Sequence, residues 1–169
     1  PADAARALGG RLVFVRGSAR DDPQEAAASA EAIVTALLAE FAENGSPQAG
    51  EVPIVANSTG GVSTGGVSTD GMLQLAVGPA GVHSDSRETF ELLGEVAAKH
   101  GLRRRTQSNE QVDTEIALEK YGRRPIDLLE EWGWLADDVT LAHLCDVTPA
   151  EIARLARAGV SATHAAGCA

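Results

Sequence analysis

Two spacings of hydrophobic residues alternate along the chain, one typical of strands and the other of helices. Short apolar runs predict five strands, at residues 11–16, 73–77, 102–107, 139–142 and 160–165. Between them, apolar residues recur at intervals of three and four, which predicts helices over residues 23–43, 87–100, 110–121, 125–132 and 149–158. Such an alternation favours a parallel sheet with right-handed crossovers.

The expected helices carry local signals at their ends. Asp22 before a proline and Ser86 are N-cap candidates, and Thr148 with Glu151 forms a capping box. The periodicity also predicts which side chains face the core. These are Ile33, Leu37, Leu38 and Phe41; Phe90, Leu93, Val96 and Ala97; Val112, Ile116 and Leu118; Ile126, Leu128, Leu129 and Trp132; and Ile152, Leu155 and Ala156.

Residues 44–71 differ from the rest, because glycine, serine and threonine dominate and Gly-Gly-Val-Ser-Thr occurs twice. We expect one domain over residues 1–169, with a mobile insertion at 44–71 that holds a short strand at 52–56. A phosphate-binding loop is the alternative, but no Gly-Lys-Ser/Thr follows. The five strand–helix units fit either an open doubly wound sheet or part of a closed barrel, since eight units typically need about 250 residues.

Composition excludes several classes of partner. With 24 acidic and 14 basic residues the net charge is −10, so we expect no nucleic acid and no membrane surface as partner. Two cysteines, Cys145 and Cys168, form no disulfide framework, and no apolar run reaches about 20 residues; a cytoplasmic location is therefore expected. The run 103–105 holds three arginines, which favours a solvated edge strand, a strand whose partner is missing, or an arginine that reaches an acidic residue in the centre.

One histidine stands where an α/β barrel places its chemistry. His143 follows an apolar run at a strand's carboxyl end, although a structural histidine is the alternative interpretation. Glu110 is either functional or a helix-start carboxylate that the helix dipole favours. We expect His83 and His100 at the surface, and Cys145 in packing. Trp132 and Trp134 are expected in the core.

The stretch 121–143, Tyr-Gly-Arg-Arg-Pro-Ile-Asp-Leu-Leu-Glu-Glu-Trp-Gly-Trp-Leu-Ala-Asp-Asp-Val-Thr-Leu-Ala-His, resembles the amidohydrolase superfamily. The closest resemblance is to its zinc-dependent deaminases and chlorohydrolases of guanine-like, cytosine-like and triazine rings. Residues 150–163 continue the match, and residues 11–18 and 73–101 extend it more weakly. The resemblance implies a partial (β/α)8 (TIM-like) barrel, about strands three to seven, in which metal-activated water attacks a ring carbon.

Residue roles follow from the same resemblance. It implies that Glu110 is the proton shuttle and that His143 orients the attacking water or the substrate. It also places Gln107 and His164 in the substrate pocket. Where the family carries His-Thr-His before Leu-Ala-Glu, this chain reads Arg-Thr-Gln-Ser-Asn-Glu, so Gln107 stands in the place of a metal ligand. The His-x-His pair of the family's first strand has no counterpart, and its final aspartate would lie beyond Ala169.

Two hypotheses follow from this comparison. The first is a truncated zinc hydrolase that acts on a heterocyclic small molecule, but binds no metal and is inactive as this chain alone. The second is a non-catalytic α/β scaffold or binding domain. The chain begins at Pro1 rather than methionine, so we expect that its first residues have been removed or that it belongs to a longer protein. Under the first hypothesis it is an internal fragment or a decayed relative of such a hydrolase. A partial barrel has two sheet edges, so self-association is expected.

Overall fold

The computed structural model describes residues 4, 7–43, 66 and 73–164. Apart from Gly66, the insertion predicted at 44–71 lies outside the described residues, as do the strand predicted at 52–56 and Cys168. In the described part of the chain, no helix has both the length and the apolar character needed to cross a membrane.

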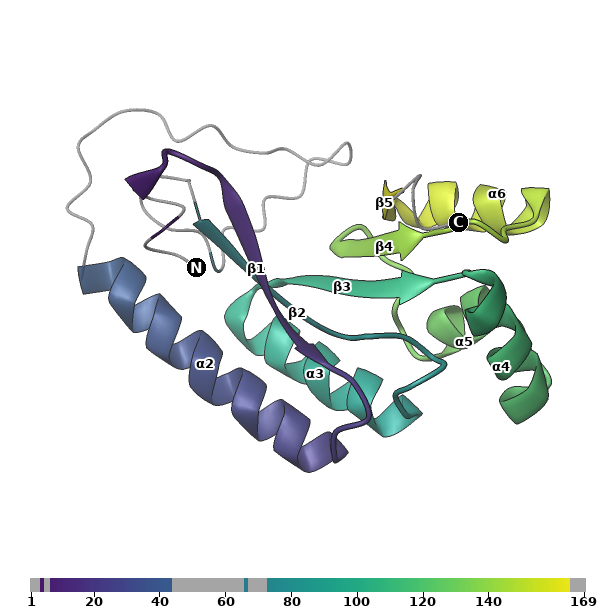
Figure 1. Ribbon diagram of the computed structural model, residues 1–169, viewed down its shortest axis with the longest axis horizontal. Helices are drawn as coiled ribbons and strands as arrows, with labels where there is room; N and C mark the ends of the chain where they lie inside the picture. The colour runs from purple at the N-terminus through teal and green to yellow at the C-terminus, as the bar shows by residue number, and fades with distance from the viewer. Residues whose placement is uncertain (1–3, 5–6, 44–65, 67–72, 165–169) are drawn as a thin grey trace.

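The described strands form a single parallel sheet whose order follows the sequence (Figure 1). They are β1 (Leu12–Ser18), β2 (Leu73–Pro79), β3 (Arg103–Ser108), β4 (Val139–His143) and β5 (Ser161–Thr163), and each pairs in parallel with the next. A doubly wound sheet reverses its strand order at a switch point, whereas a barrel continues in one direction. The sequential order therefore selects the barrel-type arrangement and places β3 in the centre rather than at an edge.

Helices connect successive strands. They are α2 (Pro23–Glu43), α3 (Arg87–His100), α4 (Gln111–Tyr121), α5 (Pro125–Glu131) and α6 (Pro149–Ala158). Figure 1 shows α2 and α3 side by side along β1 and β2, while α4 begins where β3 ends. The predicted caps are present: Ser86 accepts a hydrogen bond from the Thr89 amide, and Thr148 and Glu151 form the capping box. Local sequence thus fixed these helix ends as expected.

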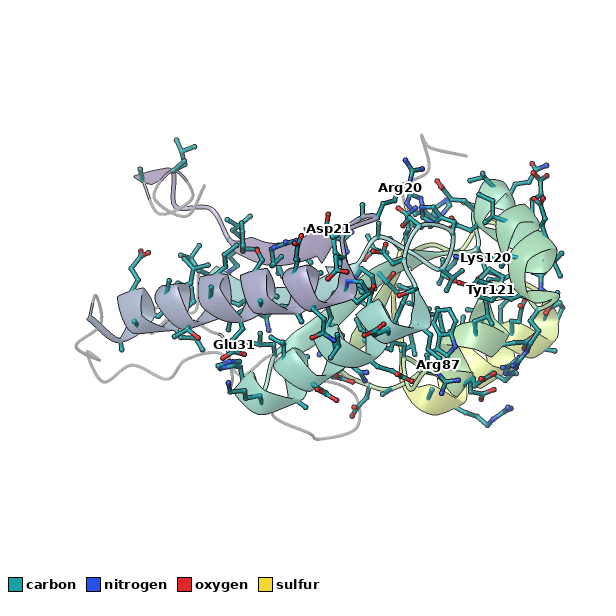
Figure 2. The ribbon with its side chains drawn as sticks, turned by 90° about the horizontal axis from the view of Figure 1, so that it is seen from below. Arg20, Asp21, Glu31, Arg87, Lys120 and Tyr121 are labelled. Atoms are coloured by element: carbon teal, nitrogen blue, oxygen red, sulfur yellow. The ribbon has the colours of Figure 1, made fainter. Side chains whose placement is uncertain are left out.

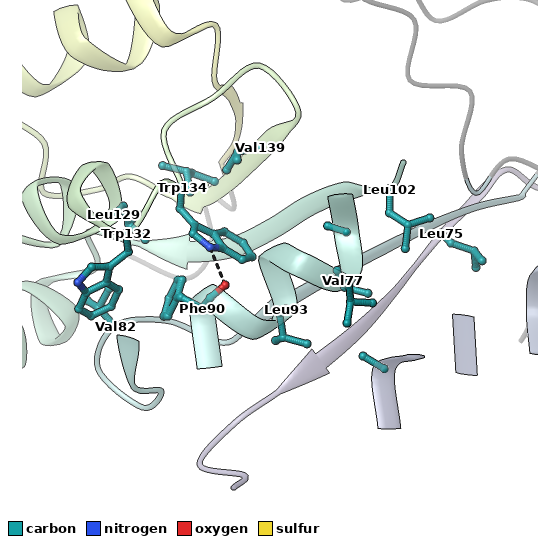
Figure 3. Close-up of a cluster of buried hydrophobic side chains, with 14 of the residues drawn as sticks. Leu75, Val77, Val82, Phe90, Leu93, Leu102, Leu129, Trp132, Trp134 and Val139 are labelled. Carbon is teal, nitrogen blue, oxygen red and sulfur yellow. Dashed lines mark hydrogen bonds between the residues drawn. The ribbon is translucent and has the colours of Figure 1, made fainter. Parts of the chain in front are cut away.

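The core lies between the sheet and the helices (Figure 3). Trp132 and Trp134 are 7% and 1% exposed, and each packs its ring 5.1 Å from the ring of Phe90. The Trp134 indole donates a hydrogen bond of 3.0 Å to the Phe90 carbonyl oxygen, so its polar atom is satisfied. The predicted core role of both tryptophans is confirmed.

Three helices bury faces that differ from the predicted ones. Val112, Leu118 and Ile152 are about half exposed, and Ala156 is exposed. Instead α4 buries Asp113, Thr114 and Ala117, and α6 buries Glu151 and Leu155. On α2, Phe41 is buried as predicted, but Ile33, Leu37 and Leu38 are only partly covered while Ala26, Ala30 and Val34 are buried. On α4 and α6, polar contacts explain the difference. Asp113 faces inward because it contacts the imidazole of His83, and Glu151 because it pairs with Arg124.

His100 is the last residue of α3, and its side chain is only 16% exposed rather than at the surface as predicted. Its Nε2 lies 2.9 Å from a carboxylate oxygen of Glu31, which also accepts a hydrogen bond of 2.7 Å from Lys99. Figure 2 shows Glu31 on α2 next to the end of α3. Hydrogen bonds from Lys99 and His100 lower the pKa of Glu31. These contacts tie α2 to α3 at the end remote from the pocket described below.

Candidate functional site

A pocket of about 420 Å³ opens where the strands end. Four neighbouring strands and the turns after them contribute its lining, which includes Gly17, Gly78, Arg105, Gln107, Ala142 and His143. This is the edge of the sheet at which α/β barrels place their active sites. Two of the predicted site residues, Gln107 and His143, line the pocket directly.

A third predicted residue, Glu110, contacts His143. Glu110 is the N-cap of α4, two residues after β3, and His143 is the last residue of β4. The Nδ1 atom of His143 lies 3.1 Å from Oε1 of Glu110, and both side chains are mostly buried. Adjacent parallel strands therefore bring together a carboxylate and an imidazole that lie 33 positions apart in the sequence.

The backbone around this pair adopts the left-handed conformation, which is rare outside glycine. His143 has φ 73° and Leu144 has φ 54°, and Asn109, directly before Glu110, has φ 59°. Asn109 is fully buried, and its amide donates a hydrogen bond of 2.9 Å to the Asp146 carbonyl oxygen. Such conformations cost about 1–3 kcal/mol each and cluster at functional sites. The chain thus maintains a strained geometry at the two strand ends that carry Glu110 and His143.

The structure adds a second imidazole–carboxylate pair that the sequence did not indicate. His83, in the turn after β2, is not at the surface as predicted: its Nδ1 lies 2.7 Å from Oδ1 of Asp113, whose side chain is only 1% exposed. Gly81 makes room for the ring, since a Cβ atom there would lie 2.6 Å from His83 Nδ1. The first turn of α4 therefore presents Glu110 to His143 and Asp113 to His83.

The contacts of His83 with Asp113 and Gln107 show how its imidazole is oriented. Burial raises the pKa of Asp113, while the positive form of His83 and a hydrogen bond from the Glu110 amide oppose that rise. Because Nδ1 of His83 faces the carboxylate, Nε2 faces the amide nitrogen of Gln107 at 3.5 Å. A neutral ring with its proton on Nδ1 would place that proton on the side of the Asp113 carboxylate and its acceptor nitrogen on the side of the Gln107 amide.

The three arginines of β3 have different surroundings. Arg104 forms two hydrogen bonds of 2.7 Å to the carboxylate of Asp138 and lies over the Trp134 ring, so it does reach an acidic residue, but one that directly precedes β4. Arg103 donates to the Asp137 carbonyl oxygen. Arg105 lines the pocket and forms no ion pair or side-chain hydrogen bond with any described residue. The expected edge strand is wrong, because β3 lies between β2 and β4.

The residues at the pocket do not fit a catalytic zinc ion. Such a site needs about three protein ligands of imidazole, thiolate or carboxylate type. Gln107 carries an amide, and the two imidazoles near this end of the sheet among the described residues, those of His83 and His143, fall short of that number. Among the described residues, no group of three or more His, Cys, Asp or Glu side chains could hold a metal.

The remaining candidates are not among the described residues that line the pocket. His164, just after β5, places Nδ1 3.1 Å from the His143 carbonyl oxygen, but it is exposed and is not among the residues that line the pocket. Cys145 is exposed rather than packed, in contrast to the prediction. The pocket and its two imidazole–carboxylate pairs therefore come from β1–β4 and the first turn of α4.

The comparisons with known proteins point to one group of hydrolases. No protein-family model matches the chain. The 8-oxoguanine deaminase of Pseudomonas aeruginosa is 36% identical over 93 residues, which is 54% of this chain and 21% of that enzyme. The atrazine chlorohydrolase of Arthrobacter aurescens, solved with zinc, superposes with a TM-score of 0.67 at 27% identity, over 96% of this chain and 33% of the enzyme.

A third comparison supports the fold alone. The guanine deaminase of C. acetobutylicum has a TM-score of 0.68 at 14% identity, over 96% of this chain and 35% of that enzyme. The chain thus matches about a fifth of the length of the sequence relative and about a third of each solved structure. The predicted α/β barrel-type fold is confirmed, and the chain is related, over part of their length, to the deaminases and chlorohydrolases of the amidohydrolase superfamily.

Proposed function

We propose that the chain contributes the pocket and the proton-transfer pair of an enzyme that hydrolyses a nitrogen heterocycle, by deamination or dechlorination. The observation that carries the proposal is the contact of 3.1 Å between Glu110 and His143 at the carboxyl ends of β3 and β4. The chemistry of the relatives supports the substrate class, because the sequence relative deaminates 8-oxoguanine and the structural relative acts on a triazine.

The pair suits the proton movements that such a hydrolysis requires. Water must lose a proton as its oxygen adds to the ring carbon, and the leaving amine must gain one as the C–N bond breaks. Glu110 can accept the first proton and return it, while His143 orients the carboxylate through Nδ1. Neither residue supplies the Lewis acid that would lower the pKa of the attacking water molecule.

We therefore propose that the 169 residues do not turn over substrate by themselves. Gln107 and Arg105 occupy the places that the resemblance assigns to histidines, and the described residues do not assemble a zinc site. The same observation favours a second candidate function, a pocket that binds a small molecule without catalysis. A test separates these: zinc content and ammonia release are measured for the purified 169-residue chain with 8-oxoguanine and guanine.

The expected result is less than stoichiometric zinc and no ammonia above a no-protein blank. Turnover that persists in the wild-type chain and is lost in Glu110→Gln would reject the proposed inactivity while supporting the role of Glu110. Turnover that is unchanged by Glu110→Gln would reject the assigned proton transfer. The variant Glu119→Gln, at an exposed position on α4, serves as the matched control for loss of a carboxylate.

A further inference from the structure

Three side chains lie in series between the first turn of α4 and the pocket: Asp113, His83 and Gln107. Oδ1 of Asp113 lies 2.7 Å from Nδ1 of His83, and Nε2 of His83 lies 3.5 Å from the amide nitrogen of Gln107, which lines the pocket. The side chain of Asp113 is 1% exposed and that of His83 is 17% exposed, so water has little access to their contact. The proton transfer proposed above gives these three side chains no role.

The contact between Asp113 and His83 determines which ring nitrogen carries a proton. Neither Oδ1 of Asp113 nor Nδ1 of His83 has another hydrogen-bond partner among the described residues, so these two buried atoms have only each other. The second oxygen, Oδ2, accepts a hydrogen bond of 3.3 Å from the backbone amide of Glu110, which favours the ionised carboxylate. An ionised carboxylate has no proton to donate. Nδ1 therefore carries the proton, and Nε2 of the neutral ring is left as an acceptor.

An acceptor at Nε2 selects one orientation of the Gln107 amide, because only the amide nitrogen can donate to it. Packing holds the two side chains beside each other: a Cβ atom at Gly81 would lie 2.6 Å from Nδ1 of His83 and 3.2 Å from Cγ of Gln107. The Gln107 backbone amide also donates a hydrogen bond of 3.0 Å to the Ala80 carbonyl oxygen. With its nitrogen directed toward His83, the amide has its carbonyl oxygen left to offer to a ligand.

We propose that Asp113 and His83 are positioning residues that hold the amide of Gln107 so that its carbonyl oxygen accepts a hydrogen bond from an N–H group of a heterocyclic ligand. Such a site favours a ring that carries an amino group over the same ring without one. The inference deepens the proposed function and rests on it for the ligand class and the choice of pocket. It concerns binding and the tautomer of His83, and neither depends on Glu110 or on ammonia release, so the two proposals fail separately.

The first measurement determines the tautomer of His83 by NMR of the imidazole nitrogens in the isotope-labelled chain. It is made at about pH 8, where imidazoles are ordinarily neutral, and His83→Phe assigns the signals. The wild-type ring is expected to carry its proton on Nδ1. In Asp113→Asn, whose amide can donate to Nδ1 as well as accept from it, the fraction of rings with the proton on Nε2 should rise. A wild-type ring that is protonated on Nε2, or on both nitrogens, would overturn the proposal.

The second measurement compares the affinities of 2-aminopurine and purine, which differ by one amino group, by isothermal titration calorimetry at the same pH. His83→Phe keeps a planar ring without its nitrogens, and Gln107→Leu removes the amide itself. His100→Phe is the matched control, because His100 also contacts a carboxylate, that of Glu31, and is 16% exposed, but does not line the pocket. Circular dichroism verifies that each variant is folded. Gln107→Leu leaves Asp113 with its partner, so the test stays decisive if His83→Phe does not fold.

The wild-type chain and His100→Phe are expected to bind 2-aminopurine about three- to tenfold more tightly than purine, the range that corresponds to one hydrogen bond. The preference is expected to vanish in Gln107→Leu and to weaken in His83→Phe, where nothing orients the amide. Equal affinities in the wild-type chain, no detectable binding of either purine, or a preference that survives in Gln107→Leu would each overturn the proposal. An undiminished preference in a folded His83→Phe would refute the positioning role.

Discussion

The position of His83 depends on a side chain that is absent at Gly81. A Cβ atom at residue 81 would lie 2.6 Å from Nδ1 of His83 and 2.7 Å from its Cε1. We expect Gly81→Ala to displace the ring from Asp113 and to lower the free energy of unfolding by about 1–3 kcal/mol, because a buried carboxylate loses its partner. Urea denaturation measures the stability, and the NMR shifts of the imidazole nitrogens report the lost contact.

Gly94 on α3 provides a control, because the same substitution, glycine to alanine, is expected there to raise rather than lower the free energy of unfolding. A Cβ atom there would lie 3.7 Å from the Trp134 indole nitrogen, which is an ordinary van der Waals distance. Gly94→Ala should therefore raise the free energy of unfolding by up to about 1 kcal/mol through helix propensity. If both variants changed stability in the same direction, the close packing of His83 against residue 81 would not explain the first result.

Single residues also mark the limit of what the sequence could predict at the site. His143 could be singled out because it stands at a strand end, where barrel chemistry is expected, and Glu110 through the resemblance to a hydrolase family. His83 could not, since its partner Asp113 lies 30 positions away (113 − 83 = 30) and only the packing of β2 beside β3 brings them together. A histidine two residues after a glycine in a turn gives no sequence signal by itself.

At the scale of elements, the backbone of β3 lies directly against Gly78 of β2. A Cβ atom there would lie 1.6 Å from the Arg105 carbonyl oxygen, which belongs to the backbone and cannot rotate away. We expect Gly78→Ala to separate the two strands and to lower the free energy of unfolding by about 2 kcal/mol or more, as overpacking typically does. Thermal unfolding followed by circular dichroism measures the loss.

Gly17 is the matched control for this prediction, because it pairs with Gly78 in the register of β1 and β2. A Cβ atom at Gly17 would meet only the Gly78 carbonyl oxygen, at 3.8 Å. Gly17→Ala should therefore leave the melting temperature nearly unchanged. A Gly78→Ala protein as stable as Gly17→Ala would contradict the close approach of β3.

The ends of the helices follow from local sequence, whereas the faces that the helices bury depend on packing. The helix ends at Ser86, Thr148 and Gly101 were predictable, because capping uses groups within a few residues of the end. The buried face of α4 was not, since Asp113 is drawn inward by His83 and leaves Val112 half exposed. Hydrophobic periodicity fails on α4 because its first turn faces a polar site rather than the core.

For the whole molecule, the dependence of stability on pH should reflect the buried carboxylate of Glu151. Burial opposes its ionisation, but hydrogen bonds from Arg124 and Thr148 outweigh that effect and lower the pKa of Glu151 below its ordinary value of 4.5. Because the pKa of Glu151 is lower in the folded than in the unfolded chain, its carboxylate stabilises the folded protein at pH values above 4.5. This contribution is lost as the pH falls through the pKa that Glu151 has in the folded protein. The free energy of unfolding should therefore decrease on acidification below this pH.

The variant Glu151→Gln tests the assignment, since it cannot ionise. Its free energy of unfolding should be lower than that of the wild-type chain at neutral pH, and the two should converge as the pH is lowered. Glu119→Gln, at an exposed position, should follow the wild-type curve. Denaturation curves collected at a series of pH values give the comparison, and parallel wild-type and Glu151→Gln curves would exclude Glu151 as a source of the acid sensitivity.

The order of the strands was only partly accessible from sequence. Alternating strands and helices predicted a parallel sheet, but the doubly wound and barrel alternatives share that pattern and differ in which strands become neighbours. The sequential pairing from β1 to β5 decides between them. Strand order depends on where each helix packs, which periodicity along one element cannot report.

The open sheet leads to a last prediction, that the chain self-associates. Among the described residues no strand covers the outer edge of β1, whose seven residues leave backbone groups available for pairing. Val13 of β1 is 52% exposed, so Val13→Lys should not disturb folding, and the added charge should disfavour contact between copies of the chain.

Light scattering after size exclusion should give a mass above one chain for the wild type and a lower mass for Val13→Lys. Val112→Lys, at a position 49% exposed on α4, should leave the wild-type mass unchanged. A wild-type chain that is monomeric at all concentrations would mean that the edge is protected, and the expectation would be wrong.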